Sequence, residues 1–152
     1  ADISQREARH EELHQLFAGD ARAAQLATSA TSLAEHLKRV GYAPPRARAD
    51  VLMHAHCHQK ALWGTGAEVE LLRAAGVTLA TPDTGCCGMA GSFGYRPQFY
   101  EASKRIAGLA LLPALQAGPD ATVLASGFSC REQIEALSGR RTLHFAEVLA
   151  RA

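Results

Sequence analysis

Two adjacent cysteines, Cys86 and Cys87, stand inside the glycine-rich run GCCGMAGSFGY at residues 85–95. A disulfide between neighbouring cysteines is far from normal disulfide geometry. Two adjacent thiolates instead suit a soft metal ion or an iron–sulfur cluster, because a cationic centre relieves the repulsion between them. Glycines on either side, Gly85 and Gly88, allow the backbone to turn sharply beside a bulky ligand. The run therefore predicts a metal site built from thiolates.

The chain has two further cysteines, Cys57 and Cys130, and each is expected to follow a β-strand. In open parallel sheets, ligands bind at the carboxyl ends of the strands, near a topological switch point. If Ser129 caps the next helix, Cys130 lies in its first turn, where free N–H groups favour a thiolate. We therefore expect Cys57, Cys86, Cys87 and Cys130 to converge as metal ligands although they are far apart in the sequence.

The spacing of the cysteines leaves the kind of centre open. The chain contains no CxxC pair, so it differs from a zinc ribbon and from the cysteine runs of ferredoxins. A structural zinc site used for docking is one alternative. A thiol–disulfide oxidoreductase, in which Cys86 or Cys87 attacks a disulfide, is another. The plain structural alternative is that the cysteines are small buried apolar residues. No histidine or aspartate accompanies Ser92 or Ser129, which excludes a serine nucleophile.

Polar and glycine residues beside the cysteines are candidates for orienting the thiolates by hydrogen bonds. His54, His56 and His58 occupy every second position of a segment expected to be extended. Side chains alternate along such a segment, so these three would lie on the same face of it. The candidate supporting residues are His56, His58, His144, Gly85, Gly88 and Arg131. Each of these residues also has an ordinary structural explanation: a polar residue at the rim of the sheet, a residue at the start of a helix, or a charged side chain in solvent.

The composition is that of a globular domain with a substantial core. The chain has 152 residues, and 16 Lys/Arg against 15 Asp/Glu leave a net charge of +1. This balance argues against a nucleic-acid partner, and no apolar run is long enough to span a membrane. The opening residues lack the layout of a secretory signal, and four cysteines are few for a disulfide scaffold. We therefore expect a reducing, cytoplasmic location.

The apolar pattern predicts an α/β domain with a roughly four-stranded parallel sheet flanked by helices, preceded by an N-terminal helical pair. The expected strands are 51–56, 77–81, 122–125 and 142–145. The expected helices are 4–17, 21–40, 65–75, 97–111, 129–137 and 146–151. Asp20, Thr65 and Ser129 are expected helix caps, Pro97 suits a first turn, and Pro113 ends or kinks a helix. We divide the chain into a helical segment, 1–45, and a cysteine-rich domain, 46–152.

Four segments carry a resemblance to a known family. They are HCHQKAL at 56–62, GCCGMAGSFGY at 85–95, GFSCREQI at 127–134 and LHFAEVLA at 143–150. Together they resemble the cysteine-rich CCG domain found in heterodisulfide reductase and in the iron–sulfur subunit of glycolate oxidase. The likeness is greatest to the C-terminal domain of large FAD-linked D-2-hydroxy-acid oxidases and dehydrogenases.

The resemblance implies an iron–sulfur site, expected to be a 4Fe-4S cluster. Cys57 matches the first cysteine of the pattern, Cys86 and Cys87 match its CC pair, and Cys130 matches the last cysteine of a final CxxC. Gly127 replaces the first cysteine of that CxxC, so this chain has four thiolates where the fuller pattern has five. A simpler cluster, zinc or an empty site is the alternative that this departure allows.

The resemblance also implies a function for the chain. It is expected to carry electrons within a FAD-linked oxidoreductase that acts on a D-2-hydroxy acid of the lactate, glycolate or 2-hydroxyglutarate type. FAD is expected on a separate domain, and the flavin and ferredoxin-like domains of the same enzyme are the expected partners. A quinone, a carrier protein or a disulfide would take the electrons, and partners would provide any peripheral contact with a membrane. The chain alone is not expected to turn over substrate.

Overall fold

The computed structural model of the protein describes residues 13–151. The chain divides into two compact units, Ala1–Tyr42 and Ala43–Ala152. The described part of the first unit contains the helices α2 (Leu13–Leu16), α3 (Ala21–Ser29) and α4 (Leu33–Arg39). Most of the predicted helix 4–17 lies outside the described residues.

The predicted single helix over 21–40 is wrong, because the chain forms two helices there. Asp20 caps α3 as expected, and its carboxylate accepts a hydrogen bond of 2.8 Å from the Arg22 N–H. The hydroxyl of Ser32 then accepts from the Glu35 N–H, while the Glu35 carboxylate accepts from the Ser32 N–H at 2.9 Å. This reciprocal capping box starts α4 and interrupts an apolar stripe that otherwise continues through it.

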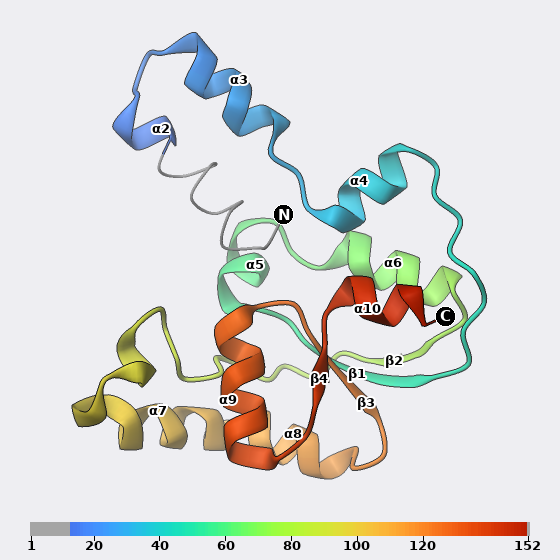
Figure 1. The fold of residues 1–152 in the computed structure, drawn as a ribbon, viewed down its shortest axis with the longest axis vertical. Helices are drawn as coiled ribbons and strands as arrows, with labels where there is room; N and C mark the ends of the chain where they lie inside the picture. The colour runs from blue at the N-terminus through green and yellow to red at the C-terminus, as the bar shows by residue number, and fades with distance from the viewer. Residues whose placement is uncertain (1–12, 152) are drawn as a thin grey trace. The chain divides into compact units, whose positions relative to one another are not determined.

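The second unit is an α/β domain with a four-stranded parallel sheet, as predicted (Figure 1). The strands are β1 (Asp50–His54), β2 (Thr78–Ala80), β3 (Thr122–Ala125) and β4 (Thr142–Leu143), and their order across the sheet is β2-β1-β3-β4. The central pair is in register, with His54 opposite Ala125 at the carboxyl ends of β1 and β3. Both strands are short and apolar because helices cover both faces of the sheet.

Helices cover the two faces of the sheet in separate groups. They are α5 (Cys57–Leu62), α6 (Gly66–Ala74), α7 (Pro97–Leu109), α8 (Leu111–Ala117), α9 (Phe128–Ser138) and α10 (Phe145–Ala150), with a short 3-10 turn η2 (Phe93–Tyr95). In Figure 1, α6 and α10 lie on one side of the sheet, and α7, α8 and α9 lie on the other.

Several helix boundaries differ from the sequence-based predictions. The helix α5 was not predicted at all. Neither Thr65 nor Ser129 forms the expected capping hydrogen bond: Thr65 precedes α6 without one, and α9 begins earlier, with Gly127 at its N-cap. Pro97 opens α7 as expected. That helix ends at Leu109, and Pro113 lies in the first turn of α8, where a missing N–H is tolerated.

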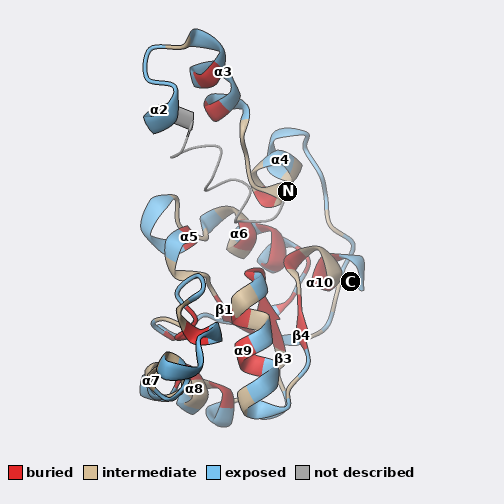
Figure 2. Cartoon of the chain, turned by 60° about the vertical axis from the view of Figure 1, so that its left-hand side comes forward, coloured by how far each residue is buried: buried red, intermediate tan, exposed pale blue. Residues whose placement is uncertain are grey.

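One hydrophobic cluster fills the space between the sheet and the helices α8 and α9. Figure 2 shows buried residues along β1, β3 and the inner side of α9. The buried members are Leu52, Cys87, Met89, Leu111, Leu115, Val123, Ala125, Cys130 and Ile134. Two of the four cysteines are therefore part of the core itself, on the face of the sheet where α9 packs.

Candidate metal centre

The sheet topology brings the candidate residues to one place. The chain leaves β1 for β2 and then crosses to β3 on the other side of β1, so the switch point lies between β1 and β3. His54 is the last residue of β1, and Cys130 follows β3 in the first turn of α9. Cys87 follows β2. Parallel sheets bind ligands at this edge, beside the switch point.

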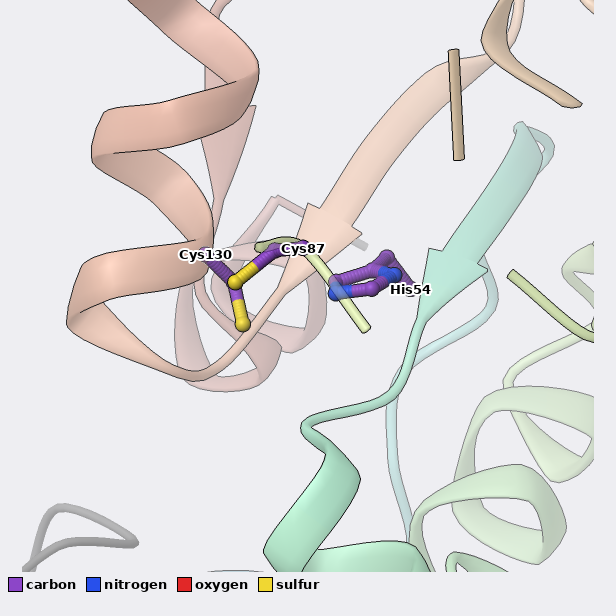
Figure 3. Close-up of side chains that lie close together, drawn as sticks. All are labelled: His54, Cys87 and Cys130. Carbon is purple, nitrogen blue, oxygen red and sulfur yellow. The ribbon is translucent and has the colours of Figure 1, made fainter. Parts of the chain in front are cut away.

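Three buried side chains form the centre of the site. The ring nitrogen of His54 and the sulfur atoms of Cys87 and Cys130 all lie within 4.8 Å of one another. Figure 3 shows the imidazole of His54 directed toward the two sulfur atoms. All three residues are buried, and Cys130 is only 1% exposed. The structure therefore offers one nitrogen and two sulfur donors to a single metal ion.

The hydrogen bonding of His54 leaves one of its nitrogens without a partner. Its Nδ1 lies 2.5 Å from the hydroxyl oxygen of Thr84, which is also buried. Its Nε2 is buried and has no hydrogen-bond partner among the described residues. An unpartnered polar atom in a core costs about 1–3 kcal/mol. A metal ion is the kind of group that would satisfy this nitrogen.

The two buried cysteines shift each other's pKa in opposite directions. A hydrogen bond with the thiol of Cys130 lowers the pKa of Cys87 most strongly, burial opposes this shift, and the nearby His54 lowers the pKa further. The same hydrogen bond, together with burial, raises the pKa of Cys130. Of the two, Cys87 is therefore the cysteine that loses its proton more readily. A thiolate in the core is costly unless a positive charge accompanies it, and a bound metal ion supplies that charge.

The other two predicted ligands, Cys57 and Cys86, form a half-buried pair beside this centre. Burial raises the pKa of Cys57, and the charge of Cys86 and a hydrogen bond with it raise the pKa further. The charges of Cys57 and Cys86 also raise the pKa of Cys130, though less than Cys87 does. The four thiols are thus near enough to influence one another. That all four bind metal stays a prediction.

Gly88 allows the cysteine pair to pack against α7. Its backbone has a φ of +94°, and a Cβ at this position would overlap the carbonyl oxygen of Ser103. Its N–H donates to the sulfur of Cys86 at 3.3 Å. Ser103 in turn accepts a hydrogen bond of 2.9 Å from the side chain of Gln133, which ties α7 to α9. Glycine is therefore needed at this position for packing, and a supporting role of Gly88 at a metal site stays a prediction.

Gly85 lies in an exposed link between the cysteine loop and α5. Its φ is +59°, so it too adopts a backbone conformation that favours glycine. Its carbonyl oxygen accepts a hydrogen bond of 3.3 Å from the ammonium group of Lys60. The same ammonium lies 3.2 Å from the carboxylate of Asp83. This contact holds the loop next to the helix that carries Cys57.

The expectation that three histidines share one side is wrong, because the chain turns into α5 at Cys57. His54 points to the sulfur atoms, whereas His56 is the N-cap residue of α5 and His58 is exposed. The rings of His56 and His58 make an edge contact with centroids 5.4 Å apart. The sequence alone does not assign His54 to the site. Its position at the end of a buried strand is the signal that distinguishes it from His56 and His58.

The two remaining supporting candidates are His144 and Arg131. His144 is the N-cap residue of α10, and its Nδ1 accepts a hydrogen bond of 3.1 Å from the Ala146 N–H. Arg131 follows Cys130 and is half-buried, and its Nε is buried with no hydrogen-bond partner among the described residues. His144 therefore caps a helix, and a supporting role of Arg131 stays a prediction.

Fold and side chains together define an α/β domain with a cysteine- and histidine-rich candidate metal centre at its sheet edge. The chain is 37% identical over 99 residues to a D-2-hydroxyglutarate dehydrogenase of Pantoea ananatis (strain AJ13355), covering 64% of this chain and 10% of that protein. It is 32% identical over 107 residues to a D-2-hydroxyglutarate dehydrogenase of Pseudomonas putida, covering 69% of this chain and 10% of that protein.

A second kind of relative matches a similar share of the chain. One of the subunits of the anaerobic glycerol-3-phosphate dehydrogenase of Escherichia coli (strain K12) is 32% identical over 103 residues, which are 67% of this chain and 26% of that protein. The matched region thus spans about a tenth to a quarter of the length of these relatives. No family model and no solved structure matches the chain. Among the described residues, no helix has the length and apolar character needed to cross a membrane.

Proposed function

We propose that this chain is the iron–sulfur-binding, electron-transfer domain of a dehydrogenase that acts on a D-2-hydroxy acid of the 2-hydroxyglutarate type. The names of its relatives support an oxidoreductase, since all of those compared are dehydrogenases or parts of one. The single observation that carries the metal-binding part is the convergence of the buried group His54, Cys87 and Cys130 with the neighbouring Cys57 and Cys86.

The donor set fits an iron–sulfur cluster. Thiolates are the usual cluster ligands, and a cluster supplies one-electron chemistry when it is bound. Cys57, Cys86, Cys87 and Cys130 would hold it. Cys87 and Cys130 are buried and would exclude water from such a group, whereas Cys57 and Cys86 lie at the half-buried rim, where a partner can approach.

The proposed enzyme needs parts that this chain does not contain. FAD would be bound by a separate domain that oxidises the substrate, and a ferredoxin-like domain would connect the flavin to this centre. The electrons would then pass to a quinone, a carrier protein or a disulfide. We expect the enzyme in the cytoplasm, and we expect no turnover of substrate by this chain alone.

A zinc site is the second candidate function, and one observation favours it. One imidazole and two thiols within 4.8 Å are three of the four ligands of a tetrahedral Cys/His zinc site. Such a domain would serve in docking rather than in redox chemistry. Disulfide exchange by Cys86 or Cys87 is the remaining alternative. Cys87 is only 3% exposed, so a substrate disulfide has little access to its sulfur, and the half-buried Cys86 would have to be the attacking thiol.

Metal and sulfide analysis decides between these functions. The chain is purified without oxygen, reconstituted with iron and sulfide, and analysed for iron, zinc and acid-labile sulfide per chain. We expect iron with matching sulfide, a loss of both in Cys86→Ser, and no loss in Thr28→Ser, which alters an exposed helix position. Zinc without sulfide would support the docking domain instead. No metal in the reconstituted wild type would overturn both.

A further inference from the structure

We infer that Nε2 of His54 is itself a metal ligand, so that the centre is a mixed nitrogen–sulfur site. This inference rests on the proposed function only in requiring that the chain binds metal. The evidence is the position of the ring: His54 is 1% exposed, its Nε2 has no hydrogen-bond partner among the described residues, and it points at the sulfur atoms of Cys87 and Cys130.

The strand places this nitrogen at the sulfur atoms. Side chains alternate across a strand, so His54 shares the face of Leu52, which packs in the same core cluster as Cys87 and Cys130. His54 also pairs with Ala125, the last residue of β3, just before the turn that leads to Cys130. The imidazole is therefore held by the most buried part of the sheet rather than by a loop. A rigid strand is a good support for a metal ligand.

Thr84 is the residue that orients the imidazole. Its hydroxyl oxygen lies 2.5 Å from Nδ1 of His54, and Thr84 is 1% exposed, so water has little access to take its place. When Nδ1–H donates to this oxygen, the lone pair of Nε2 is free and faces the two sulfur atoms. Metal-binding histidines commonly donate a hydrogen bond from the N–H of their other ring nitrogen in this way, and the contact fixes their tautomer. Thr84 is thus a positioning residue.

The neighbouring histidines do not occupy the same position. His56 lies beside Gly127, and a Cβ at Gly127 would be only 2.9 Å from its ring. His56 is also the N-cap residue of α5 and has further contacts of its own. His58 is exposed. Of the described histidines, His54 is the one whose ring nitrogen groups with two cysteine sulfur atoms.

Cobalt binding tests the inference without enzyme activity. The reduced chain is titrated with Co²⁺ alone under nitrogen, and the sulfur-to-metal charge-transfer and d–d bands are recorded. We expect His54→Leu to weaken Co²⁺ binding at least about tenfold and to change the d–d bands, because one ligand is lost. His36→Leu, the same substitution at an exposed position in α4, leaves both unchanged. Equal affinity and equal spectra for His54→Leu would overturn the inference.

Two further measurements keep the test decisive if His54→Leu fails to fold. X-ray absorption of the wild-type chain with Co²⁺ should show a nitrogen ligand together with sulfur, and a shell of sulfur alone overturns the inference. Thr84→Val keeps the shape of the side chain and should weaken Co²⁺ binding by about 10- to 100-fold while the nitrogen ligand remains. Iron and sulfide are measured separately. A nitrogen ligand without cluster formation therefore leaves the inference standing and removes only the iron–sulfur proposal.

Discussion

Gly127 and His56 lie so close that no side chain fits between them. A Cβ built at Gly127 would be 2.9 Å from Cδ2 of His56 and 3.3 Å from the sulfur of Cys130. The backbone of Gly127 has a φ of −77°, which any residue can adopt. The restriction is therefore steric and comes from the imidazole ring. It explains why a residue at the N-cap of α9, directly beside the candidate metal centre, is glycine.

We predict that Gly127→Cys, which places a cysteine where the pattern that the sequence resembles has one, destabilises the chain by about 1–3 kcal/mol because the His56 ring must move. The double variant Gly127→Cys with His56→Ala should recover most of this loss. Urea unfolding of the wild type, both single variants and the double variant gives the coupling energy. Additive effects of the two substitutions would show that the ring does not restrict position 127.

Gly88→Ala should be the most damaging of the glycine substitutions in the cysteine loop. It places a Cβ against the carbonyl of Ser103 and also forces alanine into a φ of +94°. Gly91→Ala is the matched control, because its φ is +64° but no atom lies near the added Cβ. We expect the free energy of unfolding to fall by about 1 kcal/mol in Gly91→Ala and by several kcal/mol in Gly88→Ala. Urea unfolding measures both changes. Equal decreases in the two variants would mean that the overlap of the new Cβ with α7 does not destabilise the fold.

The sheet could be predicted from the sequence, whereas the exact helix starts could not. The strand ending at His54 is apolar and short, and such a segment has few alternatives in a domain that alternates strands and helices. The motif around Thr65 has the composition of a capping box, yet its hydroxyl makes no capping hydrogen bond. The local sequence shows which side chains are able to form a capping hydrogen bond. The packing of the helix against the sheet decides which of these hydrogen bonds form.

The sequence indicates only part of the candidate site, because the contacts within the site also depend on how the strands and helices pack. The pairing of Cys86 with Cys57 and of Cys87 with Cys130 depends on the strand order, and the four positions were expected at one edge. His54 was not assigned to the site, because the turn into α5 after His56 has no strong signal in the sequence. Gly127 was interpreted as a missing ligand. That His56 fills the space beside it becomes visible only in three dimensions.

Glu135 provides a pH-dependent contribution to stability. Its carboxylate accepts hydrogen bonds from the backbone N–H of Thr142 at 3.1 Å and from the Thr142 hydroxyl at 2.9 Å. These bonds lower the pKa of Glu135 below its usual value of 4.5. The stabilisation is therefore complete above pH 4.5 and is lost as the pH falls through the lower pKa of the folded state.

We predict that Glu135→Gln lowers the free energy of unfolding at pH 7 by at most about 1 kcal/mol, since solvent screens this exposed carboxylate. The difference from the wild type should disappear as the pH is lowered below 4.5. Urea unfolding at a series of pH values measures it. Thr142→Val, which removes one of the two donors, should reduce the pH-dependent part. A difference that persists unchanged in acid would contradict the assignment to the ionised carboxylate.

The four cysteines should react with a maleimide in two stages in the metal-free chain. Cys57 and Cys86 are half-buried, whereas Cys87 and Cys130 are 3% and 1% exposed. The lowered pKa of Cys87 favours reaction, because the thiolate is the nucleophile, but a bulky reagent must also reach the sulfur. We expect burial to prevail, so that Cys57 and Cys86 are labelled first and Cys87 and Cys130 react at the rate at which the chain opens.

Peptide mass spectrometry at successive times follows this order, and urea should abolish the difference between the two pairs. Bound metal should slow the labelling of Cys57 and Cys86 as well, because ligated thiolates are not free to attack. If Cys87 is labelled first in the absence of urea, its sulfur is accessible in the folded chain. That result would restore disulfide exchange at Cys87 as a function to be tested against metal binding.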